Sequence, residues 1–302
     1  MLVTIVIPFH NAYKTIDQLL SSIPSGKDLE VILVDDNSEV QPIIDVSRYC
    51  HQFKIYSLQG IRYAGSARNL GVLHATGKYI YFADADDIID TDNFTACLSY
   101  LQNSDDDIIF TMSDSFYESN YKRAKRHLGF NLAIFKYLNS RDIVALSNHT
   151  TPTSKFIKKQ FIVRNKLVFS TNRVSNDVLF SLKLILAHPN VFIFPVVTYL
   201  IRCNFSSGLT KLRTRETIFS RVRTVIKFNS ILSGLRKEEF MIPLSSYALT
   251  LSNYPILFFR LLCYFIIKGF PLILPKKIIA KALYCRFLDL YKNNFNNSFN
   301  HA

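Results

Sequence analysis

The sequence lacks the cysteine patterns that mark metal sites and disulfide frameworks. Its five cysteines, Cys50, Cys97, Cys203, Cys263 and Cys285, follow neither spacing, and their number is odd. This usage favours a reducing compartment. The chain also begins directly with an apolar run that reads as a strand and has no basic segment before it, so we expect no signal peptide.

Glycine-rich phosphate loops are missing as well. The nine glycines include no Gly-x-Gly-x-x-Gly, which argues against a dinucleotide site of the usual type. A nucleotidyltransferase on a related sheet would carry a glycine-rich loop after its first strand, and none is present. No RNA- or DNA-binding motif occurs either.

What is present is a globular composition with uneven charge. The chain has 302 residues, of which 49% are hydrophobic and 14% aromatic. Residues 211–292 hold 15 basic and four acidic residues, or +11 of the total net charge of +13. We therefore expect a nearly neutral domain over residues 1–210 and a basic region over residues 211–302. Basic appendages are typical of proteins that bind nucleic acid or an anionic membrane surface.

Apolar runs alternate with helical spacing along the first part of the chain. Strands are predicted at residues 2–7, 30–34, 54–58, 79–83 and 107–112, and helices at residues 16–23, 43–46, 64–75 and 94–101. The alternation predicts an α/β fold with a mostly parallel sheet and helices on both faces. In such sheets ligands bind beyond the carboxyl ends of the strands.

Polar clusters follow three of these strands: the turn from Pro8 to Asn11, the pair Asp35 and Asp36, and the acidic residues 84–87. Three carboxylates within four positions repel each other and raise their own pKa values unless a cation neutralises them. Mg²⁺ or Mn²⁺ suits such an oxygen-rich cluster. A solvated acidic turn is the alternative for an isolated pair of aspartates, but the two other clusters point to one binding crevice.

The motifs along this half resemble those of family 2 glycosyltransferases with the GT-A fold. They occur in the expected order over about 210 residues: Val3-Thr4-Ile5-Val6-Ile7-Pro8 before Asn11, Val34-Asp35-Asp36-Asn37-Ser38, Gly65-Ser66-Ala67-Arg68-Asn69-Leu70-Gly71, and Thr76-Gly77-Lys78 before Asp84-Ala85-Asp86-Asp87. The resemblance implies an inverting enzyme that uses a nucleotide-diphosphate sugar and a divalent metal.

The resemblance also implies roles for individual residues. Residues of the first two clusters would bind the nucleotide, Arg68 would lie near the base and pyrophosphate, and the acidic cluster would serve ribose and metal. The implied donor-binding residues are Pro8, His10, Asn11, Asp36, Arg68, Asp84 and Arg202, and the implied metal ligands are Asp86 and Asp84. A tyrosine is common where His10 stands. For Arg68 and Arg202 a structural ion pair is the alternative.

Asp177 opens a predicted helix in which Leu179, Leu182 and Leu186 share a buried side. An aspartate there is a favourable first-turn charge in most proteins. The resemblance implies instead the base that deprotonates the acceptor hydroxyl. Asn176 replaces the glutamate that often precedes this base, so Asp177 is the carboxylate left for the role.

Three further stretches carry expectations. Residues 121–127 form a basic loop that is either solvated or contacts the acceptor or a phosphate. Residues 191–201 predict two strands, and residues 206–210 resemble the loop that closes over the diphosphate in the family.

The basic region predicts amphipathic helices. One carries Arg213, Arg215, Arg221, Arg223 and Lys227 beside Ile218, Val222, Val225 and Ile226, and a similar pattern recurs over residues 278–290. Between them, residues 256–274 are strongly apolar, but Arg260, Lys268 and Pro271 interrupt them. Binding to the surface of an anionic membrane is the preferred interpretation. A spanning helix and a dimer-forming helical hairpin are the alternatives.

These features together predict a metal-assisted glycosyltransferase, cytoplasmic and peripheral on the inner face of the cell membrane. UDP is the expected nucleotide of the donor. The expected acceptor is a hydroxyl of a glycan or glycolipid, either lipid-linked or part of a surface polysaccharide such as lipopolysaccharide or capsule. We expect no nucleic-acid partner. The competing hypothesis is a non-catalytic protein that binds nucleotides or nucleic acid through the basic region.

Overall fold

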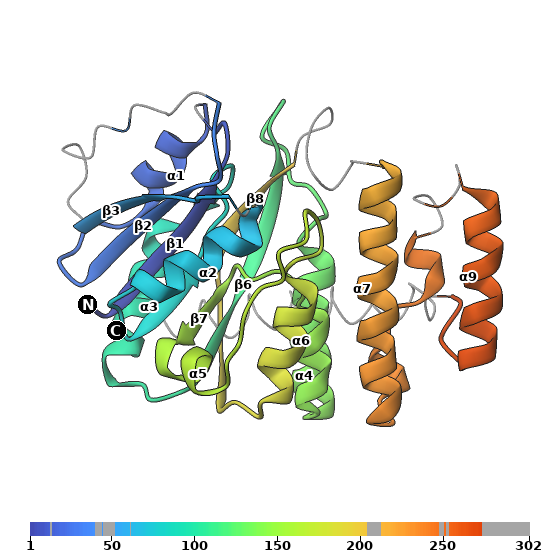
Figure 1. Cartoon of the computed structure of the whole chain (residues 1–302). Coiled ribbons are helices and arrows are strands. Elements are labelled where there is room, and N and C mark those ends of the chain that lie inside the picture. The colour runs from blue at the N-terminus through green and yellow to red at the C-terminus, as the bar shows by residue number, and fades with distance from the viewer. Residues whose placement is uncertain are drawn as a thin grey trace.

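An eight-stranded sheet runs through the computed structural model (Figure 1), in the order β3-β2-β1-β4-β7-β6-β8-β5. The structure describes residues 1–12, 14–39, 44, 52–60, 62–203, 213–247, 251 and 254–273. The strands are β1 (Val3–Phe9), β2 (Leu29–Asp35), β3 (Gln52–Ser57), β4 (Tyr79–Phe82), β5 (Ile88–Ile89), β6 (Ile108–Tyr117), β7 (Lys155–Lys158) and β8 (Val191–Cys203).

The first four strands of the order are parallel, so their carboxyl ends share one edge. Phe9 at the end of β1 is level with Asp35 at the end of β2, and β4 ends beside Val6. Pro8 therefore lies beyond the end of β4, where β1 has no neighbour on that side. A proline, which lacks an N–H group, is tolerated there. β1 continues to Phe9, one residue past Pro8.

The remainder of the sheet is mixed, which refines the expectation of a mostly parallel one. β7 is antiparallel to both β4 and β6, and β5 is antiparallel to β8. β6 and β8 are parallel, but their register shifts between Phe110 and Met112, opposite the part of β8 that contains Pro195. The shift absorbs the proline, so residues 191–203 form one long strand rather than the two we expected.

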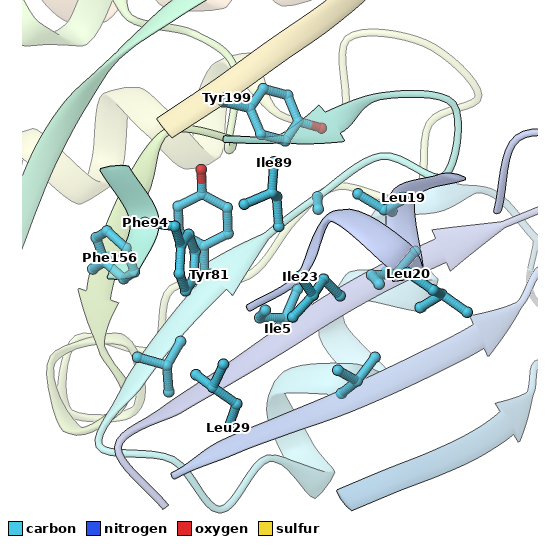
Figure 2. Close-up of a cluster of buried hydrophobic side chains, with 14 of the residues drawn as sticks. Ile5, Leu19, Leu20, Ile23, Leu29, Tyr81, Ile89, Phe94, Phe156 and Tyr199 are labelled. Carbon is cyan, nitrogen blue, oxygen red and sulfur yellow. The ribbon is translucent and has the colours of Figure 1, made fainter. Parts of the chain in front are cut away.

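Helices cover both faces of the sheet (Figure 1). They are α1 (Ile16–Ser22), α2 (Ala64–His74), α3 (Thr91–Asn103), α4 (Leu128–Ser140), α5 (Lys159–Arg164) and α6 (Val178–Leu186). One buried cluster joins the sheet to α1 and α3, and Figure 2 shows it with Leu19, Tyr81 and Phe94 between these layers. A second cluster joins the opposite face to α2, α4, α5 and α6. The α/β prediction is thereby confirmed.

A third cluster attaches the basic region. It contains apolar residues of α7 (Arg215–Gly234) and α9 (Pro255–Lys268), of the short 3₁₀ helices η4 (Glu238–Phe240) and η5 (Leu244–Tyr247), and of η2 (Ile143–Asn148) and α6 in the sheet-bearing part. Ser220 on α7 also donates to the Val174 carbonyl oxygen, 3.4 Å away. Among the residues described, no helix is long and apolar enough to cross a membrane.

Some expectations were incomplete, and others lie outside the described residues. α4 was not predicted, although Phe130, Ala133, Ile134 and Tyr137 have helical spacing, and the two-residue strand β5 is too short to predict. Arg221 is buried on α7 rather than on its exposed basic side. The predicted helices over residues 43–46 and 278–290 and the predicted loop over residues 206–210 cannot be compared with the structure, because they include residues that it does not describe.

Candidate active site

The turns after β1 and β2 are bonded to each other. The Asp36 amide donates to the Phe9 carbonyl at 2.8 Å, and the exposed His10 ring lies with Nδ1 2.8 Å from the Asp36 carbonyl oxygen. Asn11 receives a bond from the Glu39 amide at 3.0 Å. The structure therefore brings together Pro8, His10, Asn11 and Asp36, four of the residues predicted to bind the donor.

Asp36 also fixes the start of α2. Its Oδ1 accepts a hydrogen bond of 2.8 Å from the amide of Tyr63, which immediately precedes that helix. Tyr63 has a φ of 84°, an uncommon value for a residue with a side chain. The bond to Asp36 stabilises this turn and so orients α2, which carries Arg68.

Arg68 connects two segments that are far apart in the sequence. Its Nη2 donates to Asp84 Oδ1 at 2.6 Å, and its Nη1 donates to Asn176 Oδ1 at 3.0 Å. The guanidinium is buried and lies 5.5 Å from the centre of the Phe169 ring. Within the described part of the chain, Nε of Arg68 is buried without an acceptor. One arginine thus links the end of β4 to the segment before α6.

A glycine allows this close approach of α2. A Cβ atom added at Gly65 would lie 2.1 Å from the Ser170 carbonyl oxygen and 3.0 Å from Cβ of Asn176. Any larger residue would force apart α2 and the segment that leads to Asp177. Gly65 therefore has a packing role at this position.

The acidic residues form a turn directly after β4. Asp84 is partly exposed, Asp86 is exposed and Asp87 is buried. The pKa of Asp86 is raised because surrounding protein atoms displace water and because the charge of Asp84 is near. Burial, Asp86 and Asp84 raise the pKa of Asp87 well above its usual range. Burial and mutual repulsion therefore disfavour the charged forms of Asp86 and Asp87.

Two residues of β8 hold this turn in place. The Tyr199 hydroxyl accepts a bond of 2.8 Å from the Asp84 amide, and Asp87 accepts one of 2.8 Å from the Arg202 amide. Figure 2 shows Tyr199 beside Ile89 at one side of the buried cluster to which both belong. The Arg202 side chain donates to the Asp86 carbonyl at 2.6 Å and to Gln18 Oε1 at 2.5 Å. Protein acceptors therefore occupy donors of Arg202 that we had assigned to a phosphate.

The acidic turn fits a hard divalent cation that is coordinated partly by the protein and partly by oxygen atoms of a substrate. The carboxylates of Asp84 and Asp86 supply hard oxygen donors, as Mg²⁺ and Mn²⁺ require. In the described residues no group of three or more His, Cys, Asp or Glu side chains is arranged to hold a metal by itself. Two carboxylates leave several positions for phosphate oxygens and water, which is the usual arrangement for Mg²⁺.

Asp177 stands at the N-cap of α6, but its side chain makes no capping hydrogen bond. Burial raises its pKa, and Asp84 adds to this effect, whereas the charges of Arg68 and Lys155 lower the pKa. Asp177 therefore shares its electrostatic environment with the acidic turn. A carboxylate that has a raised pKa and does not cap the helix is suited to act as a general base.

Two residues of this site were not assigned a role from the sequence. Tyr199 belongs to a buried strand, where an aromatic residue needs no functional explanation. Asn176 was noted only for replacing a glutamate, yet its side chain bonds Arg68. Both contacts join residues more than 100 positions apart, so no local signal predicts them.

The fold and the arrangement of the site are those of the GT-A class. The family model described as Glycosyl transferase family 2 matches residues 4–164, more than half of the chain. The protein belongs to this family. The match includes the turns after β1 and β2, Arg68 and the whole acidic turn, and it ends before Asp177.

Two bacterial relatives illustrate the range of similarity. The chain is 24% identical over 217 residues to the glycosyltransferase GlyG of Streptococcus pneumoniae, a match that covers 64% of this chain and 70% of GlyG. It is 29% identical over 143 residues to an uncharacterized glycosyltransferase of Rickettsia felis. That match covers 42% of this chain, which spans only 22% of the length of the Rickettsia protein.

Solved structures show the same fold. The crystal structure of residues 1–349 of Staphylococcus aureus TarS, in complex with UDP-GlcNAc, superposes with a TM-score of 0.63 at 19% sequence identity. The superposition covers 80% of this chain and 70% of that structure. It therefore extends beyond the residues matched by the family model.

Proposed function

We propose that this protein is an inverting glycosyltransferase that moves a sugar from a UDP-sugar to a hydroxyl of a lipid-linked or surface-polysaccharide acceptor. One observation carries the proposal beyond family membership. Arg68 bonds both Asp84, on the donor side, and Asn176, the neighbour of the proposed base Asp177. A single buried side chain thus couples the groups that would serve the two substrates.

The donor would lie along the carboxyl edge of the parallel strands. The turn that contains Pro8, His10 and Asn11 would contact the nucleotide together with Asp36. His10 offers a ring that can stack on a base, and its contact with the Asp36 carbonyl orients that ring. UDP as the nucleotide is supported by the UDP-GlcNAc bound to the TarS structure of the same fold.

Asp86 and Asp84 would hold the divalent ion. Mg²⁺ or Mn²⁺ bound there would neutralise charge on the diphosphate of the donor. The protein's own contribution is orientation: Arg68 pairs with Asp84 at 2.6 Å, and the Tyr199 hydroxyl accepts a bond from the Asp84 amide. Asp86 is left exposed toward a ligand.

Asp177 would act as the general base. The acceptor oxygen forms a bond to the anomeric carbon while its proton passes to the Asp177 carboxylate. The bond from that carbon to the phosphate oxygen breaks, and its electron pair leaves with the nucleoside diphosphate. Attack from the face opposite to the leaving group inverts the configuration. The positive charges of Arg68 and Lys155 favour the ionised form that this role requires.

The basic region would bring the enzyme to an anionic membrane. One face of α9 and the residues after it expose large apolar side chains: Ile256, Phe259, Ile266, Ile267 and Ile273. Arg260 and Lys268 are exposed on the same helix. Apolar side chains beside basic ones are the pattern of helices that lie in the interface of anionic lipid.

Titration calorimetry with UDP, GDP and CMP, with and without Mn²⁺, tests the proposed donor. We expect UDP to bind most tightly of the three nucleotides. EDTA should weaken UDP binding at least tenfold. Asp86→Asn should weaken UDP binding equally in the presence of Mn²⁺. Tighter binding of GDP or CMP would reject UDP as the nucleotide. Equal binding of UDP with EDTA would reject the metal site. No binding of any nucleotide would reject the transferase proposal.

A further inference from the structure

The basic residues 121–127 form an ordered hairpin against the end of β6. The Tyr117 amide donates to the Lys122 carbonyl at 2.8 Å, and the Ala124 amide donates to the Ser115 carbonyl at 2.7 Å. The Arg126 amide then donates to Ser115 Oγ at 3.1 Å. The chain that carries these charges is therefore fixed by backbone bonds on both sides of its turn.

The cationic side chains of this hairpin have different partners. Arg123 Nε bonds Asp114 at 2.9 Å, and His127 Nδ1 lies 3.2 Å from the same carboxylate. Asp114 is thus shared by two neighbours. Arg126 is exposed, and within the described residues its guanidinium has no ion pair or hydrogen bond. Its backbone is anchored while its charge remains available.

The end of β6 lies directly beside the acidic turn. Phe116 pairs with Arg202 on β8, and the Arg202 amide donates to the buried carboxylate of Asp87. Ser115, which anchors Arg126, is the neighbour of Phe116. Arg202 Nε also donates to the Asp86 carbonyl at 2.6 Å, so the segment that anchors Arg126 lies beside the acidic turn.

Arg126 and Arg202 differ in what they can offer a ligand. Arg202 is buried over the Phe116 ring and donates to Asp86 and Gln18. A diphosphate would have to break these bonds to use it. Arg126 needs no such rearrangement, and a guanidinium matches two phosphate oxygens at once.

We propose that Arg126 binds the donor phosphate that carries the sugar and stabilises the leaving diphosphate. This rests on the proposed transfer from a UDP-sugar. When the bond between the anomeric carbon and the phosphate oxygen breaks, the electron pair stays on that oxygen, and the added negative charge lies on the phosphate nearest the acidic turn. A cation on a fixed hairpin stabilises this charge without reorganisation.

The test compares Arg126→Ala with Lys125→Ala, a neighbouring exposed residue whose loss changes the net charge equally. UDP and UMP serve as probes in titration calorimetry with Mn²⁺. Loss of a charge-assisted bond should weaken UDP binding of Arg126→Ala by about ten- to a hundredfold and leave UMP within about twofold. Lys125→Ala should bind both probes like the wild type, and Arg126→Lys should recover part of the affinity for UDP.

Three outcomes would overturn this assignment. UDP affinity of Arg126→Ala within twofold of wild type would show that Arg126 does not contact the diphosphate. An equal loss for UDP and UMP would place Arg126 at the nucleoside side instead. An equal loss of UDP affinity in Lys125→Ala would show that any positive charge on this segment has the same effect, without a specific contact from Arg126. In each case the wild type would still bind UDP, so the proposed function would stand, whereas a wild type that binds no UDP would reject both.

Discussion

The guanidinium of Arg68 lies 2.6 Å from the carboxylate of Asp84, and the same group bonds Asn176. We expect Arg68→Gln to lower the free energy of unfolding by about 1–3 kcal/mol, because partly buried acceptors lose their donor. We also expect it to weaken binding of UDP with Mn²⁺. Urea denaturation and calorimetry measure the two effects. Arg62→Gln removes an exposed arginine from the adjacent turn and should change neither quantity.

A second prediction concerns the contact between α2 and the segment before Asp177. The added methyl group of Gly65→Ala would meet the Ser170 carbonyl oxygen at 2.1 Å, so this segment must shift. Such overpacking costs about 1–3 kcal/mol of unfolding free energy. Gly129→Ala is the matched control: it lies in α4 with nothing within 4 Å and should gain about 0.5–1 kcal/mol. Equal stabilities of the two variants would contradict the close contact.

The gathering of polar turns at one edge of the sheet was predictable because its parts are local patterns. Polar residues such as His10, Asp36 and Asp84 follow β1, β2 and β4, and parallel strands bring such ends to one edge. The assignment of Arg202 was not predictable, since an arginine before a loop is compatible with either a phosphate or an ion pair. Its partners Gln18 and Asp86 come from other elements. No local pattern in the sequence predicts these contacts.

His149 provides a test of stability against pH. Its ring is fully buried beside Phe110 and Phe130, and neither nitrogen has a hydrogen-bond partner within the described residues. Burial, with the nearby Lys155 charge, holds the pKa of this imidazole well below its usual range. In the unfolded chain the His149 imidazole binds a proton near pH 6.5, whereas in the folded protein it stays neutral at that pH. The free energy of unfolding therefore decreases as the pH falls below this value.

Comparison of wild type with His149→Leu isolates this effect. Between pH 6.5 and 5.5 the wild type should lose up to about 1.4 kcal/mol more unfolding free energy than the variant, the value of one pKa unit. Chemical denaturation at the two pH values measures it. Replacement of the exposed His188 by Asn should leave the pH dependence of the wild type in place. A parallel decline in wild type and His149→Leu would show that the buried imidazole is protonated in the folded protein.

The exposed face of α9 makes the proposed membrane contact testable. Phe259 is 64% and Ile267 80% exposed, and burial of such side chains in lipid contributes about 1.5–3 kcal/mol each. The double variant Phe259→Glu with Ile267→Glu should reduce co-sedimentation with phosphatidylglycerol vesicles at least tenfold. Leu73→Glu, which changes an apolar residue of α2 that is 71% exposed, is the control. If only the double variant remains bound, or if both variants bind like wild type, α9 is not the contact.

The last prediction is that Asp177→Asn abolishes transfer and preserves the donor site. Loss of the base should lower turnover by roughly a hundred- to ten-thousandfold. Affinity for UDP and Mn²⁺ should stay within about twofold of wild type, because Asp177 would face the acceptor. In the wild type the rate should rise with pH through the raised pKa of Asp177, since only the ionised carboxylate accepts the proton.

The stability of the same variant separates a catalytic role from a structural one. Asp177 makes no capping bond that Asn would lose. Because its pKa is raised in the folded protein, its ionisation above the usual carboxyl pKa destabilises the fold, so Asp177→Asn should be at least as stable as wild type at pH 7. A stable variant that retains most of the transfer rate would place the base elsewhere. A variant that unfolds or loses UDP affinity would mean that Asp177 supports the structure instead.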